Sequence, residues 1–94
     1  MALRFLWDPP KALTNEKKHG VGFPEATTVF DDVLSSTIVD PDHSLGQERL
    51  LILGVSSRRR LLVVAHLEAA GDTIRIISAR PANRRERRDY EEGN

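Results

Sequence analysis

The sequence predicts a single α+β domain, in which helices pack against an antiparallel β-sheet. Two observations lead to this fold class. Three apolar, β-branched segments, residues 49–55, 60–67 and 72–79, follow one another with only short turn-like segments between them, as neighbouring antiparallel strands do. Helical patterns precede and follow these segments. With 94 residues, the chain is long enough for one domain with a single modest core.

The N-terminal part of the chain predicts a strand and two helices ahead of the main sheet. Asp8 stands at the N-cap of the first helix, and the two prolines that follow it lie where their missing N–H groups cost nothing. Gly20 stands where that helix ends. In the second helix, apolar residues recur every three or four positions, so one side of it faces the core. The expected elements are a strand at residues 3–7, helices at 11–18 and 24–30, and a short edge strand at 36–39.

The C-terminal stretch predicts a strand that leads directly into a basic helix. Pro81 ends the strand because it has no N–H to donate to a neighbouring strand. Asn83 then caps a helix over residues 84–92, and Gly93 lies just past its end. Residues 61–65 are apolar without interruption, which predicts a central strand covered on both faces. The first two helices can cover one face, and the last helix can cover part of the other.

The net charge is zero, but the charges are unevenly distributed. Residues 1–50 carry five Lys/Arg and eight Asp/Glu, whereas residues 51–94 carry nine Arg and six Asp/Glu. Arginine pairs bidentately with phosphate, so the C-terminal half suits a polyanionic partner. A solvated helix whose arginines pair with its own acidic residues is the alternative, and charge alone does not decide between the two.

The composition excludes several classes of protein. Without cysteine, the chain has neither disulfides nor thiolate metal sites. No apolar run approaches the roughly 20 residues of a membrane-spanning helix, and the N-terminus lacks the apolar region of a secretory signal. We therefore expect a cytoplasmic protein with no membrane partner.

Four segments carry a resemblance to a known family: FLWDPPKALTNEKKHGV, FPEATTVFDD, DHSLGQERLLILGVS and IRIISARPANRRERRDYEE. With the Lys18-His19-Gly20 tripeptide and the closing SAR…ERR.Y pattern, they resemble the BrnT family of type II toxins over nearly the whole chain. The resemblance implies a RelE-like α+β fold and a ribonuclease that shuts down translation. It also implies neutralisation by a BrnA-like ribbon-helix-helix antitoxin encoded beside the toxin, with DNA bound only indirectly through that antitoxin.

A ribonuclease that works without a metal must activate the 2′-hydroxyl, stabilise the charge of the transition state and protonate the leaving 5′-oxygen. His19 follows Lys18 at the end of the first helix, so it can move protons there or simply cap the last carbonyls. Glu48 and Arg49 open a strand, where successive side chains point to opposite faces, so only one of them can face a common site. A strand-end salt bridge is the alternative for this pair.

Arg80 ends a strand just before the break at Pro81, with no obvious acidic residue close to it in the sequence. We expect its permanently charged guanidinium to hold the scissile phosphate and neutralise the charge that develops on it. An ion pair that anchors the C-terminal helix is the alternative. The catalytic candidates are therefore Lys18, His19, Glu48, Arg49 and Arg80.

Further arginines are candidates for RNA binding. Arg75 interrupts an apolar strand, where an unpaired guanidinium is costly, so it needs a carboxylate partner or an open functional face. Tyr90 could stack on a base, although packing on the sheet is the simpler interpretation. The RNA-binding candidates are Arg75, Arg84, Arg87, Arg88 and Tyr90.

The two other histidines are not assigned to the site. His43 lies in a loop beside an acidic turn, which favours a solvent-exposed residue over a base near the substrate. His66 lies within a strand, where a core residue is the usual interpretation. Because the three histidines share no metal-ligand spacing, the sequence predicts neither a metal site nor a cofactor.

A second class of function stays open: a non-catalytic nucleic-acid- or protein-binding domain that uses the arginine-rich C-terminal helix. The co-occurrence of Lys18-His19, Glu48-Arg49 and Arg80 favours catalysis, because binding alone needs arginines but no group that transfers protons.

Overall fold

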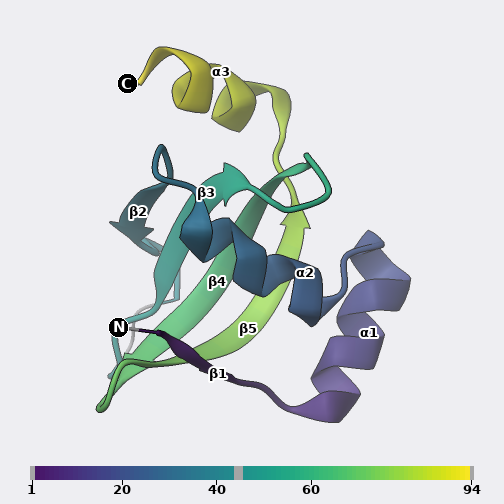
Figure 1. The fold of residues 1–94 in the computed structure, drawn as a ribbon, viewed down its shortest axis with the longest axis vertical. Helices are drawn as coiled ribbons and strands as arrows, with labels where there is room; N and C mark the ends of the chain where they lie inside the picture. The colour runs from purple at the N-terminus through teal and green to yellow at the C-terminus, as the bar shows by residue number, and fades with distance from the viewer. Residues whose placement is uncertain (1, 44–45, 94) are drawn as a thin grey trace.

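The computed structural model describes residues 2–43 and 46–93, which form a five-stranded mixed sheet with three α-helices and one 3-10 helix (Figure 1). The strand order is β1-β5-β4-β3-β2. The α+β class predicted from the sequence is confirmed. In chain order, the elements are β1 (Arg4–Leu6), α1 (Pro9–His19), α2 (Phe23–Thr27), η1 (Thr28–Asp31), β2 (Ser36–Val39), β3 (Leu50–Val55), β4 (Leu61–Ala69), β5 (Thr73–Pro81) and α3 (Arg84–Glu92).

The three consecutive strands predicted over residues 49–79 are confirmed as an antiparallel β3-β4-β5 meander, with β2 antiparallel at the β3 edge. The prediction of a wholly antiparallel sheet is wrong in one respect. Strand β1 pairs with β5 in parallel, with Phe5 opposite Ile74. The chain between these two strands includes every other strand, two α-helices and the 3-10 helix, so no hairpin fixes their relative direction.

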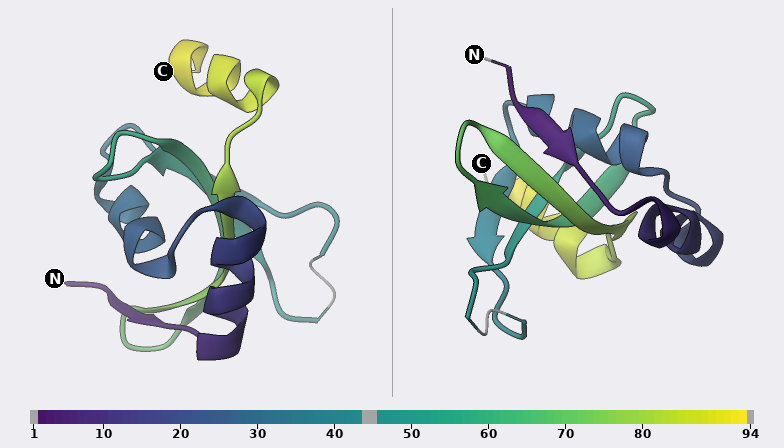
Figure 2. Two further views of the ribbon diagram at one scale, coloured as in Figure 1. Left: turned by 90° about the vertical axis from the view of Figure 1, so that its right-hand side faces the viewer. Right: turned by 90° about the horizontal axis from the view of Figure 1, so that it is seen from below.

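One face of the sheet is the main core, which α2, η1 and the segment before them cover. Figure 2 shows α2 and η1 on this face, whereas the described part of the β2–β3 loop extends on the opposite side. Strand residues two apart share a face, so the core alternates with a second set of side chains. The core residues are Val21, Phe23, Ala26, Val29, Ile52, Leu62, Val64, Ile74, Ile76 and Ala79.

The helix predicted over residues 24–30 is present but changes type within its length. It is α-helical to Thr27 and continues as the 3-10 helix η1. The hydroxyls of Thr27 and Thr28 donate to the carbonyls of Pro24 and Glu25, at 2.7 and 2.6 Å. Such side-chain bonds to the preceding turn compete with regular helical pairing. In the described part of the chain, no helix combines the length and the apolar character that crossing a bilayer requires.

The opposite side of the sheet, called here the second face, is covered differently from the prediction. Helix α3 was expected to form part of its cover, yet it contributes no buried residue. It lies beyond the end of the sheet where β3 ends (Figure 1). The register places on the second face Leu51, Leu53, Val63, Ala65, Ser78 and Arg80.

Candidate active site

A pocket of about 190 Å³ lies on the second face, where the β2–β3 loop meets the strands. This volume is below the roughly 300–1,000 Å³ of sites for drug-sized ligands, so it suits one small charged group such as a phosphate. Four strand residues, which are mostly apolar, and five ionisable residues line it. The first group is Leu51, Val63, Ala65 and Ser78, and the second is Asp40, Asp42, His43, Arg49 and Arg80.

Asp40 organises the loop side of this pocket. Its side chain is buried, and its Oδ2 lies 3.3 Å from Nδ1 of His43 and 3.3 Å from Nε of Arg49. Its Oδ1 accepts a hydrogen bond from the backbone N–H of Asp42 at 2.9 Å. That backbone hydrogen bond, aided by His43 and Arg49, lowers the pKa of the Asp40 carboxyl despite the opposing effect of burial. Asp40 is therefore a fixed anion that holds a histidine and an arginine side by side.

Arg80 enters the same pocket from β5. The sequence predicted no acidic partner for it, but the structure shows one. Its Nη1 and Nη2 donate to Oε1 and Oε2 of Glu86, both at 2.8 Å. Glu86 is six residues further along, which a search for adjacent acids misses. The hydrogen bond from Arg80 is the main reason that the pKa of Glu86 is lowered. The ion pair that anchors α3 is thus present, and it leaves Nε of the guanidinium outside the pair with Glu86.

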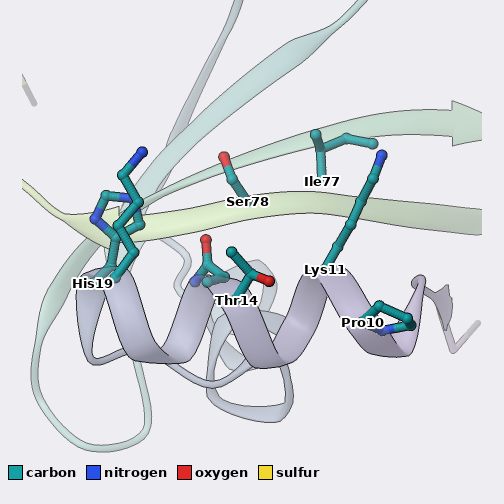
Figure 3. Close-up of a pocket in the computed structure, with 8 residues that line it drawn as sticks. Pro10, Lys11, Thr14, His19, Ile77 and Ser78 are labelled. Carbon is teal, nitrogen blue, oxygen red and sulfur yellow. The ribbon is translucent and has the colours of Figure 1, made fainter.

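Lys18 and His19 line a neighbouring pocket between α1 and β5. Figure 3 shows His19 on the helix and Ser78 on the strand at its border. Ser78 also lines the Arg49–Arg80 pocket, so the two pockets adjoin at this residue. The structure therefore brings four of the five catalytic candidates, all except Glu48, to two adjoining pockets.

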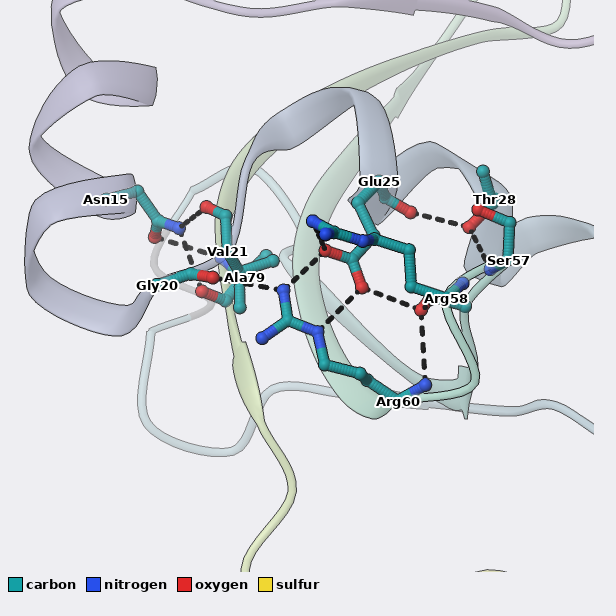
Figure 4. Close-up of polar contacts among 10 residues, drawn as sticks. Asn15, Gly20, Val21, Glu25, Thr28, Ser57, Arg58, Arg60 and Ala79 are labelled. Carbon is teal, nitrogen blue, oxygen red and sulfur yellow. Dashed lines mark hydrogen bonds and ion pairs between the residues drawn. The ribbon is translucent and has the colours of Figure 1, made fainter.

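Asn15 fixes α1 against β5 at this junction (Figure 4). Its amide nitrogen donates to the carbonyls of Ala79 at 2.9 Å and Val21 at 3.0 Å, and its Oδ1 accepts from the N–H of Ala79 at 3.0 Å. Strand β1 pairs only as far as Arg75, so the Asn15 side chain takes the place of a strand partner at Ala79. A register shift in the β4–β5 ladder lies just before Ala79, leaving Ile77 as the extra residue.

A partly buried ion pair, between Arg60 and Glu25, fixes the C-terminal end of α1, where His19 lies. Gly20 ends this helix in the left-handed conformation, with φ of 70°. Arg60 donates from Nη2 to the Gly20 carbonyl at 3.0 Å and from Nε to Oε2 of Glu25 at 2.9 Å (Figure 4). The hydrogen bond from Arg60 lowers the pKa of the buried Glu25 carboxyl, and Ser56 adds a further one.

Helix α3 begins as predicted and is attached by polar contacts. Asn83 and Glu86 form a reciprocal capping box at its N-terminus. Nearer its other end, the Tyr90 hydroxyl donates to Oδ2 of Asp32 at 2.6 Å, and this bond raises the pKa of Tyr90 to about 12. Tyr90 is thus a half-buried anchor. The exposed arginines of this helix are Arg84, Arg85, Arg87 and Arg88.

The remaining predicted residues lie apart from the two pockets. Glu48 is exposed just before β3 and is not among the residues that line either pocket, whereas its neighbour Arg49 is. Arg75 is exposed on β5 opposite Leu67, at the end of the strand that pairs with β1. Of its two predicted environments, Arg75 has the open face.

Sequence reasoning missed two members of the pocket, Asp40 and His43. His43 was interpreted as a loop histidine, and its side chain is indeed 60% exposed, but it borders the pocket that also contains Arg49 and Arg80. The Asp-x-x-His spacing in a turn was the available signal, because Asx turns bring residues that far apart together. Ser44 lies outside the described residues. Among residues 2–43 and 46–93, no group of three or more His, Asp or Glu side chains is arranged to hold a metal ion.

Comparisons with known proteins identify relatives of this fold and sequence. A protein-family model described as the ribonuclease toxin BrnT of type II toxin–antitoxin systems matches residues 7–86. Among solved structures, the crystal structure of the Brucella abortus ribonuclease toxin BrnT is similar, with 25% sequence identity and a TM-score of 0.64. That match covers 88% of this chain and 100% of the other. None of the curated proteins matches the chain.

Proposed function

The chain belongs to the BrnT family of ribonuclease toxins of type II toxin–antitoxin systems. We propose that it cleaves RNA without a metal ion at two adjoining pockets, one on its second face and one between α1 and β5. The observation that carries this proposal is that Arg49 and Arg80 line the same small pocket. Two permanently charged guanidinium groups can bind a scissile phosphate and stabilise the charge of its transition state.

The acid–base chemistry of cleavage is assigned to groups around these arginines. The 2′-oxygen attacks phosphorus as its proton leaves to a base, and the bond to the 5′-oxygen breaks as that oxygen gains a proton. Lys18 and His19 border the adjoining pocket and can serve one of these transfers. Glu48 can contribute only if RNA binding brings its exposed side chain to the phosphate, because it lies outside both pockets.

The exposed arginines of α3 and Arg75 are proposed to bind the RNA chain on either side of the cleaved bond. Contacts of this kind are with phosphates, so binding should weaken steeply as salt rises. Tyr90 is assigned to the anchoring of α3 rather than to base stacking, because its hydroxyl is held by Asp32.

The partner is proposed to be a BrnA-like ribbon-helix-helix antitoxin that covers these pockets. The toxin is proposed to have a RelE-like fold and to act on RNA in the cytoplasm. Expression of the toxin alone should then arrest growth, and co-expression of the antitoxin encoded beside it should restore growth. Arg80→Ala should be tolerated without the antitoxin. Normal growth of cells that contain folded wild-type toxin alone would contradict this assignment.

The direct test is cleavage of RNA by purified, antitoxin-free protein in the presence of a metal chelator. Arg80→Ala should lower the cleavage rate by roughly 100-fold or more, the usual loss when one such donor is removed. Arg80→Lys should restore only part of the rate, because lysine is a point charge without the planar fork. Arg4→Ala, which removes an exposed arginine from β1, serves as the matched charge control and should cleave normally.

Because Arg80 also anchors α3, a further variant separates the two roles. Glu86→Gln removes the ion pair but can keep the capping box, since glutamine also serves at this position. It should retain most of the cleavage rate. If Glu86→Gln loses as much activity as Arg80→Ala, Arg80 acts only by anchoring the helix.

The alternative function is a nucleic-acid- or protein-binding domain without catalysis, favoured by the row of exposed arginines on α3. It predicts salt-sensitive RNA binding by the wild type with no cleavage products. Substituting Arg84, Arg87 and Arg88 together would then abolish binding, whereas Arg80→Ala would leave it unchanged.

A further inference from the structure

His43 is held in a defined orientation although it lies in a loop and is largely exposed. Its Nδ1 lies 3.3 Å from Oδ2 of Asp40, and Asp40 is itself fixed by the backbone N–H of Asp42 at 2.9 Å. A carboxylate can only accept, so Nδ1 carries the proton of this contact. The other ring nitrogen, Nε2, is left to exchange a proton with a bound molecule.

The surroundings of this histidine match the requirements of RNA cleavage. Arg49 is held by the same carboxylate oxygen, at 3.3 Å, and Arg80 reaches the same pocket from the opposite side of the site, on β5. A phosphate bound by the two arginines would therefore lie beside the imidazole. A carboxylate–histidine pair next to two cations has a group for proton transfer and groups for charge stabilisation in one place.

We propose that His43 is a proton-transfer residue of the RNA cleavage reaction and that Asp40 is its positioning residue, an inference that rests on the ribonuclease function proposed above. In the reaction, a bond forms between the 2′-oxygen and phosphorus, and the bond from phosphorus to the 5′-oxygen breaks. The 2′-hydroxyl gives up a proton and the 5′-oxygen gains one. Nε2 of His43 performs one of these two transfers, and the products are a 2′,3′-cyclic phosphate and a 5′-hydroxyl.

The competing explanation is that the contact between Asp40 and His43 only shapes the β2–β3 loop. His43→Gln separates the two explanations, because an amide can still donate to Asp40 but cannot transfer a proton. We expect this variant to fold with an unchanged thermal midpoint and to cleave RNA at least about 100-fold more slowly, the range for loss of general acid–base catalysis. Its affinity for an RNA with a 2′-deoxy group at the cleaved position should stay within a few-fold of wild type.

The pH dependence of cleavage gives a readout that a structural role would not change. The charged groups that face His43 are Asp40, Asp42, Arg49 and Arg80. None of these four is of a residue type that ordinarily changes charge between about pH 5 and 8, whereas imidazole is. The limb of the pH–rate profile that His43 causes should disappear in His43→Gln, whereas a limb caused by His19 in the adjoining pocket would remain in that variant. An RNA with a 5′-thio leaving group, which needs no proton, assigns the direction: it restores the rate of His43→Gln if the histidine is the donor, and leaves the rate low if it is the acceptor.

Asp40→Asn tests the positioning residue. It should lower kcat, and its effect should be less than additive with that of His43→Gln, because the two changes share the Asp40–His43 contact and only Asp40→Asn also disturbs Arg49. Asp31→Asn, an exposed aspartate in η1 on the other face, is the matched control.

The outcomes distinguish this inference from the function on which it rests. If wild type cleaves and His43→Gln cleaves at a similar rate, or keeps the same pH profile, or loses RNA affinity in proportion to its rate, His43 is a loop residue and the inference is wrong. If the wild type yields no cleavage products, the ribonuclease function fails, and the role of His43 fails with it.

Discussion

His66 shows at the scale of one residue how burial sets a pH response. It lies on the core face of β4, with Nδ1 3.1 Å from the Val64 carbonyl and its ring edge-on to Phe30 at 4.8 Å. Burial lowers the pKa of His66, against the opposite effects of the Val64 carbonyl and of Glu68. Folding therefore holds this ring neutral where the unfolded chain would protonate it.

The sign of the effect on stability follows directly. The folded pKa of His66 is below the unfolded value of about 6.5. The contribution of His66 to the free energy of unfolding is therefore fully present above that pH, and it is lost as the pH falls through the folded pKa. We expect His66→Leu, which cannot titrate, to show a flatter profile than wild type between about pH 7 and 5. Denaturant unfolding at a series of pH values measures this difference.

Glu25 and Glu86 do not contribute to the change in stability between about pH 7 and 5. The folded pKa values of Glu25 and Glu86 are lowered from 4.5, so their contributions are present above that pH and are lost only as it falls further. Parallel profiles for wild type and His66→Leu between pH 7 and 5 would show that another group causes the decline.

At the same scale, the sequence predicted the types of the site residues better than their partners. Arg80 was chosen because a guanidinium at a strand end can hold a phosphate, and Arg49 because it opens a strand beside Glu48; both line one pocket. Asp40, the partner of Arg49, is nine residues away from it, and Glu86, the partner of Arg80, is six residues away. The fold of the β2–β3 connection and of the start of α3 brings each pair together. Their pairing depends on three-dimensional geometry, which spacing in the chain does not specify. His43 was left out for the same reason.

At the scale of elements, α3 is attached mainly through polar contacts. Among them, the contact of Tyr90 with Asp32 is the one that raises the pKa of the tyrosine to about 12. Asp32 also accepts from the N–H groups of Val55 and Leu34, at 2.8 and 2.9 Å. Burial raises the pKa of Asp32, but its hydrogen bonds with Tyr90, Val55 and Leu34 outweigh that effect and lower it. An ionised Asp32 therefore resists the ionisation of the phenol beside it.

The chain has one tyrosine, so its ultraviolet titration reports the ionisation of Tyr90 alone. We expect the wild-type phenol to ionise at about 12. In Asp32→Asn the titration should return towards the ordinary value of about 10, because the neighbouring anion is gone. Since the folded pKa is raised, the contribution to stability is fully present below about 10 and lost as the pH rises to about 12.

The same contact should govern the local opening of α3. Tyr90→Phe removes only the hydroxyl and is expected to speed amide exchange in α3 while leaving exchange in β4 unchanged, because α3 contributes no buried residue. Circular dichroism during the titration shows whether the fold persists. A wild-type midpoint near 10 with the fold intact, or uniform changes in exchange across the protein, would contradict the anchoring role.

Elements with strong local signals were predicted closely. Asn83 caps α3 as expected, and Gly20 ends α1 in the expected conformation. The position of α3 was not predictable, because its surface carries almost no apolar residues whose burial would fix it. The parallel pairing of β1 was missed because a three-residue strand has too little alternation to indicate a neighbour or a direction.

At the scale of the whole molecule, Asn15 connects α1 to the sheet beside the proposed site. Asn15→Ala would leave the buried N–H and carbonyl of Ala79 without their present partner. An unsatisfied buried group costs roughly 1–3 kcal/mol, so we expect a loss of about 2–4 kcal/mol in the free energy of unfolding. Cleavage should also fall, because Ser78 and Arg80 lie on either side of Ala79.

Asn83→Ala is the suitable comparison, because it removes another asparagine that bonds to the backbone but lies at an exposed helix start. It is expected to cost about 1 kcal/mol, as typical N-cap substitutions do. Denaturant unfolding of both variants gives the two values. A smaller loss for Asn15→Ala than for Asn83→Ala would mean that water replaces the Asn15 amide.

The amide of Asn15 also bears on how copies of this protein coexist at high concentration. Beyond the last residue of β1, the outer side of β5 would otherwise present an unpaired donor and acceptor, which is what a strand of a second chain needs in order to add to a sheet. The Asn15 side chain satisfies this donor and this acceptor of Ala79 within the same chain. Loss of Asn15 is therefore a change in colloidal behaviour as well as in stability, and concentrated Asn15→Ala should form edge-to-edge oligomers under conditions in which Asn83→Ala stays monomeric.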